Sequence, residues 1–264
     1  MSLLAVDIGN AHTVLALVRD REVSHDWRVS TDLHRTADEW AVLLRGLLGR
    51  FVGEIDGVAL CSTVPSVTQT AREMLARHFS DMPGVVVEPG VRTGLSVLTD
   101  NPREVGTDRI VNALAAATVY GGPAVVVDFG GTATTFDVVN DSGHYIGGAI
   151  CPGIEISLEA LGRGGAQLRQ VELVRPRSVI AKNTVEALQS GMVFGVAAQV
   201  EGIVARMISE LTAKGVAGDD VSVISTGYLA DLVRQECDCF TDHSPWLTHV
   251  GLELVFRRNI GDMS

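Results

Sequence analysis

The sequence has little positive charge and no long apolar run, and each shortage excludes a class of protein. Its 264 residues carry 21 Lys and Arg against 32 Asp and Glu, a net charge of −11. A nucleic-acid surface needs clustered basic residues, and none are present. No stretch approaches the roughly 20 uninterrupted apolar residues of a membrane span. The apolar run Leu3–Val6 meets Asp7 too early to be the centre of a signal peptide. We therefore expect a cytoplasmic protein that binds neither nucleic acid nor membrane.

Cysteine is scarce, and two common nucleotide-binding motifs are missing. Cys61 and Cys151 lie in apolar surroundings and are expected to be buried. Cys237-Asp238-Cys239 has no second Cys/His cluster at zinc spacing, which argues against a zinc site. The sequence contains neither Gly-x-x-x-x-Gly-Lys-Ser/Thr nor Gly-x-Gly-x-x-Gly after a strand. The first absence excludes a P-loop.

A short motif occurs twice. Val6–Val14 and Val127–Thr135 share Val, Asp, Gly and a later Thr when aligned without gaps. Each copy follows an apolar strand and leads into another, which predicts a β-hairpin with a glycine turn. Because the copies head the two halves of the chain, duplication explains them better than chance. We expect an α/β protein with mixed sheets flanked by helices, in two related lobes at residues 1–119 and 120–264.

Helix signals support this alternation of strands and helices. Thr36-Ala37-Asp38-Glu39 is a capping box that opens a helix ending near Gly49. A second helix begins near Asp108, and Gly121-Gly122-Pro123 ends it. Asn183 followed by Glu186 opens a long helix that reaches about Leu211.

An aspartate at the end of a buried strand, followed by glycine, has a clear chemical use. The glycine turn lets backbone N–H groups approach phosphate oxygens, and the carboxylate can hold Mg²⁺ through water. A single copy is compatible with an ordinary turn, whereas two related copies, at Asp7 and Asp128, favour a triphosphate site. Taken alone, Asp108 fits a helix N-cap as well as a catalytic base. Taken alone, Arg109 is compatible with a solvated charge on a helix. Thr184 is compatible with an ordinary residue in the first turn of a helix.

A set of short segments is distinctive in its order and spacing. The segments are Asp7–Asn10, Pro89–Gly94, Asn101–Arg109, Thr132–Thr135, Gly147–Gly153, Asn183–Thr184 and Thr226–Gly227. Together they closely resemble type III pantothenate kinases of the acetate kinase/sugar kinase/Hsp70/actin superfamily, and the resemblance runs from Asp7 to Asn259. The resemblance implies the actin-like ATPase (ribonuclease H-like) fold. It also implies ATP-dependent phosphorylation of the primary hydroxyl of pantothenate to 4′-phosphopantothenate, the first step of coenzyme A synthesis.

Carried over by position, the resemblance implies a role for each matching residue. Asp108 would be the general base, and Asp128 would bind a monovalent cation, K⁺ or NH₄⁺. Asp7 would hold the Mg²⁺ of Mg-ATP through water. ATP would be bound by Asp7, Ile8, Gly9, Asn10, Ala11, His12, Thr13, Val14 and Thr132. Pantothenate would be bound by Gly106, Thr107, Asp108, Arg109 and Thr184. Thr184 would reach pantothenate across a homodimer interface, which places the active site near that interface.

Departures from the family pattern fall in the nucleotide and substrate regions. The first loop has Ala11 and His12 where the family usually has Thr and Asn, and the second has an extra glycine at Gly130-Gly131. Thr99 replaces a common Tyr, and Tyr228 replaces a second Gly after Gly227. They motivate two alternatives, a catalytically weak paralogue with a regulatory or binding role and a kinase for another small hydroxy acid.

Overall fold

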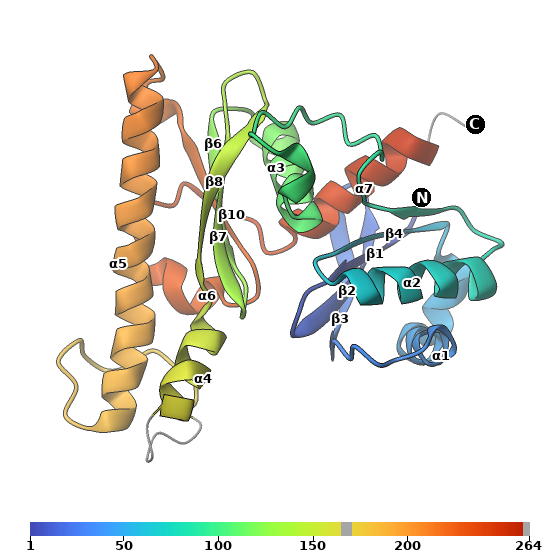
Figure 1. The fold of residues 1–264 in the computed structure, drawn as a ribbon, viewed down its shortest axis with the longest axis horizontal. Helices are drawn as coiled ribbons and strands as arrows, with labels where there is room; N and C mark the ends of the chain where they lie inside the picture. The colour runs from blue at the N-terminus through green and yellow to red at the C-terminus, as the bar shows by residue number, and fades with distance from the viewer. Residues whose placement is uncertain (165–170, 261–264) are drawn as a thin grey trace. The chain divides into compact units, whose positions relative to one another are not determined.

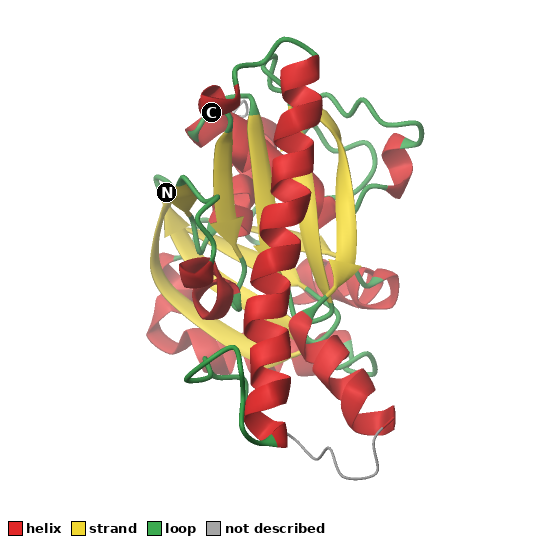
Figure 2. Cartoon of the chain, turned by 90° about the vertical axis from the view of Figure 1, so that its left-hand side faces the viewer, coloured by secondary structure: helices red, strands yellow, loops and turns green. Residues whose placement is uncertain are grey.

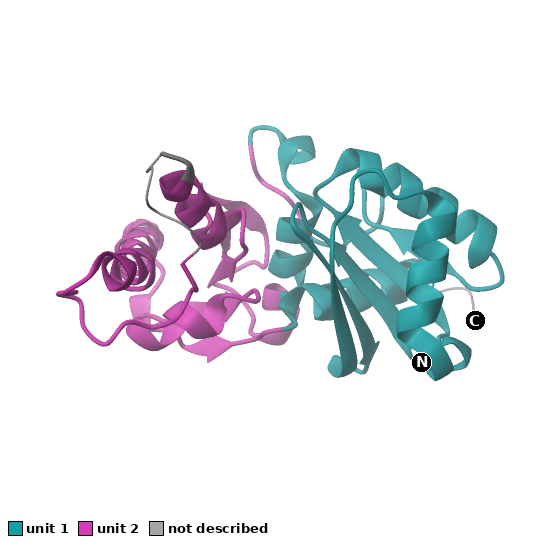
Figure 3. Ribbon diagram, turned by 90° about the horizontal axis from the view of Figure 1, so that it is seen from below, with its two compact units in different colours: residues 1–95, 100–115, 246–264 teal, residues 96–99, 116–245 magenta. Residues whose placement is uncertain are grey.

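The computed structural model of the chain describes residues 1–164 and 171–260 (Figure 1). The chain forms two compact units, coloured separately in Figure 3. The first unit is made of Met1–Leu95, Asp100–Ala115 and Trp246–Ser264, and the second of Ser96–Thr99 and Ala116–Pro245. The predicted lobes at residues 1–119 and 120–264 describe the duplicated halves of the sequence, and that division stays a prediction.

The first unit contains a five-stranded sheet in the order β3-β2-β1-β4-β5. Its strands are β1 (Leu3–Ile8), β2 (His12–Arg19), β3 (Glu22–Ser30), β4 (Gly57–Ser62) and β5 (Gly84–Val86). Its α-helices are α1 (Ala37–Leu48), α2 (Pro65–His78), most of α3 (Thr107–Val119) and α7 (Leu247–Ile260). The 3-10 helices η1 (Gly49–Glu54) and η2 (Pro102–Glu104) complete it.

The second unit contains a five-stranded sheet in the order β10-β9-β6-β7-β8. Its strands are β6 (Ala124–Phe129), β7 (Ala133–Val139), β8 (Tyr145–Pro152), β9 (Ser222–Thr226) and β10 (Asp242–His243). Its α-helices are α4 (Ile154–Gly164), α5 (Thr184–Ala213) and α6 (Ala230–Val233), with the 3-10 helices η3 (Gly218–Asp220) and η4 (Arg234–Glu236).

The two sheets have the same topology. In each, an antiparallel meander (β1-β2-β3 or β6-β7-β8) is extended by parallel strands (β4 and β5, or β9 and β10) beside its first strand. Both copies of the repeated motif form the first hairpin of a sheet, as their sequences predict. The predicted class, α/β with mixed sheets flanked by helices, is confirmed.

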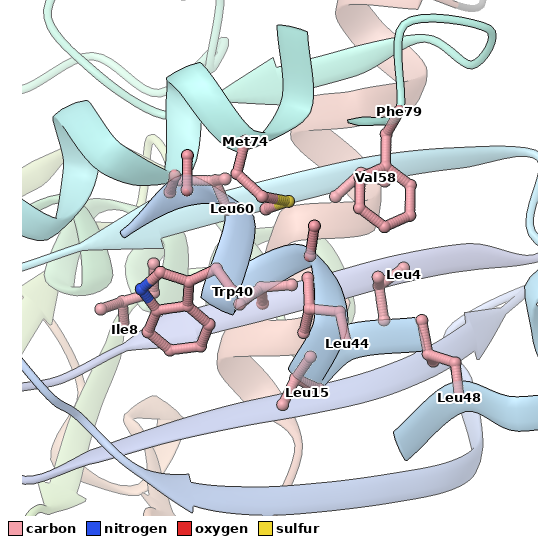
Figure 4. Close-up of a cluster of buried hydrophobic side chains, with 14 of the residues drawn as sticks. Leu4, Ile8, Leu15, Trp40, Leu44, Leu48, Val58, Leu60, Met74 and Phe79 are labelled. Atoms are coloured by element: carbon pink, nitrogen blue, oxygen red, sulfur yellow. The ribbon is translucent and has the colours of Figure 1, made fainter. Parts of the chain in front are cut away.

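Helix α1 supplies part of the core of the first unit (Figure 4). Thr36 begins the helix as predicted, because its side chain accepts from the N–H of Glu39 while the Glu39 side chain accepts from the N–H of Thr36. Trp40, Leu44 and Leu48, at helical spacing, turn one face toward the sheet. They join a buried cluster that contains the strand residues Leu4, Ile8, Leu15, Val58 and Leu60.

Helix α5 covers one face of the second sheet (Figure 2). Ala197, Val200 and Val204 are buried in the cluster that contains β6 and β9 side chains. The opposite side of the helix exposes the small residues Gly191, Gly195 and Ala198. By length and composition alone α5 could cross a membrane, with 22% of its most apolar window buried, and one such helix is weak evidence for a span.

Cys61 is buried on β4 as expected, but Cys151 is only half-buried. It lies on β8, which is an edge strand of its sheet and so is covered less completely than a central strand. The expectation that Cys151 is buried was therefore wrong.

The buried helix α7 carries a fully buried carboxylate that binds a β-hairpin turn. Asp20 and Arg21, between β2 and β3, have φ values of 51° and 68°, a conformation that costs energy for residues with side chains. Glu253 Oε1 accepts from the N–H of Asp20 at 3.0 Å, and Oε2 accepts from the N–H of Arg21 at 2.7 Å. The Arg257 guanidinium pairs with Oε1 at 2.7 Å. The buried charge is thus compensated by two backbone donors and a cation.

One turn before this carboxylate, His249 lies buried with its Nε2 3.3 Å from the carbonyl oxygen of Val14. Its Nδ1 is shielded and has no hydrogen-bond partner among the described residues. Burial disfavours the charged imidazolium and lowers the pKa of His249 to about 4, although the Val14 carbonyl opposes the shift.

We predict that the free energy of unfolding falls as the pH drops from 6.5 toward 4. In that window the unfolded state binds a proton on His249 that the folded state does not bind, so acid favours unfolding. The full effect of this one group is about 3 kcal/mol. Urea unfolding at several pH values should show a weaker pH dependence for His249→Gln than for the wild type, and an unchanged dependence would contradict the assignment.

Candidate active site

The first glycine loop connects β1 to β2 and is closed by its own backbone. The N–H of Gly9 donates to the carbonyl of His12 at 3.0 Å, which makes a tight turn between the strands. Asn10 and Ala11 are exposed at its tip, and Asp7 is half-buried at the end of β1. All of the predicted residues Ile8–Val14 therefore lie in this turn or in the strands that flank it.

Thr31, which we did not single out from the sequence, anchors the same loop. Its hydroxyl donates to the carbonyl of Gly9 at 2.7 Å and lies 2.9 Å from the hydroxyl of buried Thr13. Its N–H donates to the carbonyl of Ala11 at 2.9 Å. Because a trans peptide points its C=O and N–H in opposite directions, the N–H of Asn10 points away from Thr31. A sequence signal for this role is weak, since Thr31 merely follows a polar strand.

Asp7 is supported from the neighbouring strand. Cys61 lies opposite Asp7 in the parallel pairing of β1 with β4, and its thiol lies 3.5 Å from Asp7 Oδ1. The next residue of β4, Ser62, bonds to Thr107 at the start of α3. The Thr107 hydroxyl donates to the carbonyl of Ser62 at 3.1 Å, and the N–H of Ser62 lies 3.3 Å from that hydroxyl. Helix α3 is thereby fixed to the sheet edge at which Asp7 stands.

Asp108 follows Thr107 in the first turn of α3. The residue as a whole is half-buried, but its Oδ1 is shielded from solvent and has no hydrogen-bond partner among the described residues. A Cβ at position 106 would lie 2.5 Å from Asp108 Oδ1, so a side chain there would displace this oxygen. Asp108 thus carries a shielded oxygen with an unused lone pair, next to half-buried Arg109.

Burial raises the pKa of Asp108, while the backbone N–H of Arg109, the Arg109 charge and its own N–H lower it by less. The dipole at the N-terminus of a helix favours an ionised carboxylate. That effect is present, but loss of hydration outweighs it. A carboxylate with a raised pKa is a stronger base once ionised, as proton abstraction requires.

The second glycine loop connects β6 to β7, with Asp128 half-buried at the end of β6. The turn after β9 lies against this carboxylate. Gly227 has a φ of +90°, and a Cβ there would lie 2.4 Å from Asp128 Oδ1 and 2.7 Å from the carbonyl oxygen of Phe129. Only glycine allows this approach, which agrees with Thr226-Gly227 as a distinctive segment.

The remaining predicted residues also fall in the second unit. Thr132 is exposed at the tip of the second loop. Thr184 is exposed in the first turn of α5, after Asn183, whose side chain accepts from the N–H of Glu186 at 2.9 Å. The structure thus groups Asp7 with Asp108, and Asp128 with Thr132, while Thr184 stands at the start of α5.

The two loops differ in how well they suit a cation. Asp128 offers a carboxylate beside the close-packed Gly227 turn, and a carboxylate is a ligand that hard cations prefer. Asp7 offers a single carboxylate, which fits Mg²⁺ held mainly by water and phosphate. Over residues 1–164 and 171–260 no group of three or more His, Cys, Asp or Glu side chains is placed to hold a metal.

Solved structures share this fold over nearly the whole chain. The chain matches component A of (R)-2-hydroxyglutaryl-CoA dehydratase from Acidaminococcus fermentans with a TM-score of 0.56 and 13% identity, over 98% of this chain and 99% of that one. It matches the activator of 2-hydroxyisocaproyl-CoA dehydratase from Clostridium difficile with a TM-score of 0.51 and 10% identity, over 100% and 97%. At such low identity these matches show the fold alone, and they confirm the predicted actin-like class.

Comparison with known sequences is far more specific. A family profile described as type III pantothenate kinase matches residues 3–206. A type III pantothenate kinase from Nocardioides sp. is 71% identical over 98% of this chain and 100% of its own length. One from Streptomyces griseus is 58% identical over 98% of each chain, and one from Thermobifida fusca is 57% identical over 97% and 99%. The chain belongs to the type III pantothenate kinase family, and it is a kinase that phosphorylates pantothenate in coenzyme A biosynthesis.

Proposed function

We propose that the chain transfers the γ-phosphoryl group of Mg-ATP in line to the primary hydroxyl of pantothenate, with Asp108 as the general base. The observation that carries this proposal is the shielded, unpartnered Oδ1 of Asp108, held by the Thr107–Ser62 hydrogen bonds at the same sheet edge as Asp7. A base must accept a proton from the attacking hydroxyl, and this oxygen has a lone pair available for it.

The substrate contacts lie around this base. Gly106 and Thr107 shape the start of α3, so that the pantothenate hydroxyl can approach Asp108. Arg109 supplies a permanent positive charge next to the base, which suits a substrate that carries a carboxylate. Ionised Asp108 takes the hydroxyl proton as the oxygen bonds to phosphorus, and ADP leaves with the released electron pair.

The nucleotide is bound by the two glycine loops. Ile8–Val14 supports the phosphates with main-chain donors whose orientation Thr31 fixes. Asp7 would hold Mg²⁺ through water, and the ion would supply positive charge to the phosphate oxygens. In the second loop Thr132 would contact ATP, and Asp128 would hold K⁺ or NH₄⁺. The cation supplies positive charge near the phosphates.

We further propose that the enzyme is a cytoplasmic homodimer. The exposed small residues Gly191, Gly195 and Ala198 let a helix of the partner subunit approach α5 closely. This contact would bury apolar surface of α5 that one subunit leaves exposed. Thr184 on the first turn of α5 would then contact pantothenate bound by the partner subunit. Sedimentation of the active enzyme tests this, and a stable active monomer would contradict the role of Thr184.

A coupled assay of ADP release tests the activity. We expect ADP release from Mg-ATP to depend on pantothenate and to be stimulated when K⁺ or NH₄⁺ replaces Na⁺. Asp128→Asn should abolish the stimulation, because the cation loses its charged ligand. A folded protein that releases no ADP at saturating Mg-ATP, K⁺ and pantothenate would instead support a non-catalytic paralogue, and turnover of another hydroxy acid only would indicate a different substrate.

A further inference from the structure

Two of the departures from the family pattern meet in one place. The hydroxyl of Tyr228, from the turn after β9, donates to Glu155 Oε2 on the first turn of α4 at 2.5 Å. A Cβ at Gly131 would lie 2.1 Å from the Tyr228 hydroxyl and 2.2 Å from Glu155 Oε2. A side chain at position 131 would therefore separate the pair. The extra glycine and the unexpected tyrosine are parts of one arrangement.

The second loop is also tied to α4 through its carbonyl groups. The carbonyl of Gly131 accepts from the N–H of Ile156 at 3.2 Å, and that of Thr132 accepts from the N–H of Gly153 at 2.9 Å. Since C=O and N–H point in opposite directions in a trans peptide, the N–H groups of Thr132 and Ala133 point away from α4. Amides turned outward in this way are the donors that a glycine loop offers to phosphate.

Tyr228 is itself fixed on the other side of the loop. Gly227 packs against Asp128, and the N–H of Leu229 donates to the carbonyl of Phe129 at 3.3 Å. The Tyr228–Glu155 hydrogen bond thus joins the turn after β9 to α4 directly over Gly131. It also gives the Glu155 carboxylate a hydrogen-bond donor beside the loop that we propose binds the ATP phosphates.

We propose that Tyr228 and Glu155 form a clasp over Gly131 that positions the second loop for the phosphates of ATP. Both are positioning residues, since neither needs to touch the reacting atoms. The proposal rests on the assignment of the second loop to ATP made above. In this proposal Tyr228 has two effects. It holds the loop in place, and its hydrogen bond keeps the Glu155 carboxylate away from the nucleotide phosphates.

The two effects predict an unusual order among variants. Tyr228→Phe removes only the hydroxyl, leaves the carboxylate free, and should raise the KM for ATP about tenfold or more. Glu155→Gln removes the charge but keeps an acceptor for the hydroxyl, and should raise that KM by about threefold. The double variant loses the clasp without gaining a free charge. Its KM should therefore be lower than that of Tyr228→Phe alone.

Steady-state kinetics of the full-length enzyme with ATP and pantothenate, together with calorimetric binding of Mg-ATP in the absence of pantothenate, provide the test. We expect kcat and the KM for pantothenate to stay within about twofold, because neither Tyr228 nor Glu155 needs to touch the reacting atoms. Matched controls are Tyr120→Phe and Glu159→Gln, the latter one turn further along α4. Neither control should change the KM for ATP. Thermal melting verifies that each variant is folded.

An unchanged KM for ATP in folded Tyr228→Phe would overturn the clasp. A double variant with a higher KM for ATP than Tyr228→Phe would do the same. Failure of the function proposed above looks different, because the wild-type enzyme would then show no pantothenate-dependent ADP release. A fall in melting temperature without a change in the KM for ATP would assign the pair a purely structural role and also reject the proposal.

Discussion

Replacing Asp108 with asparagine is expected to lower kcat by about 10²- to 10⁴-fold, the usual contribution of a general base. Asparagine has nearly the same shape, so α3 and its Thr107 anchor should remain in place. What is lost is the oxygen that accepts the proton of the attacking hydroxyl. Steady-state kinetics with ATP and pantothenate measure the loss, and Mg-ATP binding should be nearly unchanged.

The matched control is Asp38→Asn. Asp38 also lies in the first turn of a helix of the first unit, but it is exposed and accepts from His78, at 2.6 Å from Nε2. We expect its replacement to leave kcat unchanged. Near-normal turnover of folded Asp108→Asn would reject the assignment of the base.

The wild-type pH profile gives a second view of the same group. Because the base must be ionised, kcat/KM should decline as the pH falls through the pKa of Asp108. Burial puts that pKa above the ordinary 3.8, so the acidic limb should lie above 3.8.

Replacing Glu253 with alanine is expected to lower the free energy of unfolding by about 3–5 kcal/mol. The change leaves the N–H groups of Asp20 and Arg21 without their acceptor and removes the buried partner of Arg257. It also removes the contacts that hold two residues with positive φ in the hairpin turn. Urea denaturation should show the midpoint moving to lower concentration.

Two further variants separate the causes of this loss. Arg21→Gly relieves backbone strain and should recover about 1 kcal/mol in the Glu253→Ala background. Glu210→Ala removes an exposed carboxylate from α5 and should change stability by less than about 0.5 kcal/mol. A Glu253→Ala protein as stable as the wild type would show that the turn does not depend on this carboxylate.

Local signals predicted much of the fold. The capping box at Thr36, the cap at Asn183 and the repeated hairpin each encode their structure within a few residues, and each formed as expected. Their bounds shifted by only a few positions, as the ends of helices and strands usually do.

Other elements lacked such signals. β3 is an edge strand with most of its residues exposed, and the alternation of its apolar residues Val23, Trp27 and Val29 is interrupted by His25. α7 has the opposite problem, because it is buried on nearly all sides and includes the buried polar residues His249 and Glu253. A helix buried all round has no amphipathic face, and its polar residues make it resemble a surface segment.

The residues of the candidate site also fall into some that have a local sequence signal and others that lack one. Strand-end aspartates and glycine turns are visible as short motifs, so Asp7 and Asp128 could be found without a structure. Their supports come from distant parts of the chain. Thr31, which follows β3, hydrogen-bonds to Gly9 in the first loop. Thr107, at the start of α3, hydrogen-bonds to Ser62 at the end of β4. The roles of the motif residues in catalysis stay predictions until the variants above are measured.

The return of α7 to the first unit sets an order on protein synthesis. The chain leaves the ribosome N-terminus first. Once Pro245 has emerged, every strand of the second sheet is outside the ribosome. At that moment the first unit still lacks Trp246–Ile260, and with it the acceptor for the turn at Asp20 and the imidazole beneath Val14. The half of the enzyme that is translated first is therefore the half that is completed last, and a nascent chain arrested just before α7 would expose an unfinished first sheet to proteases and chaperones.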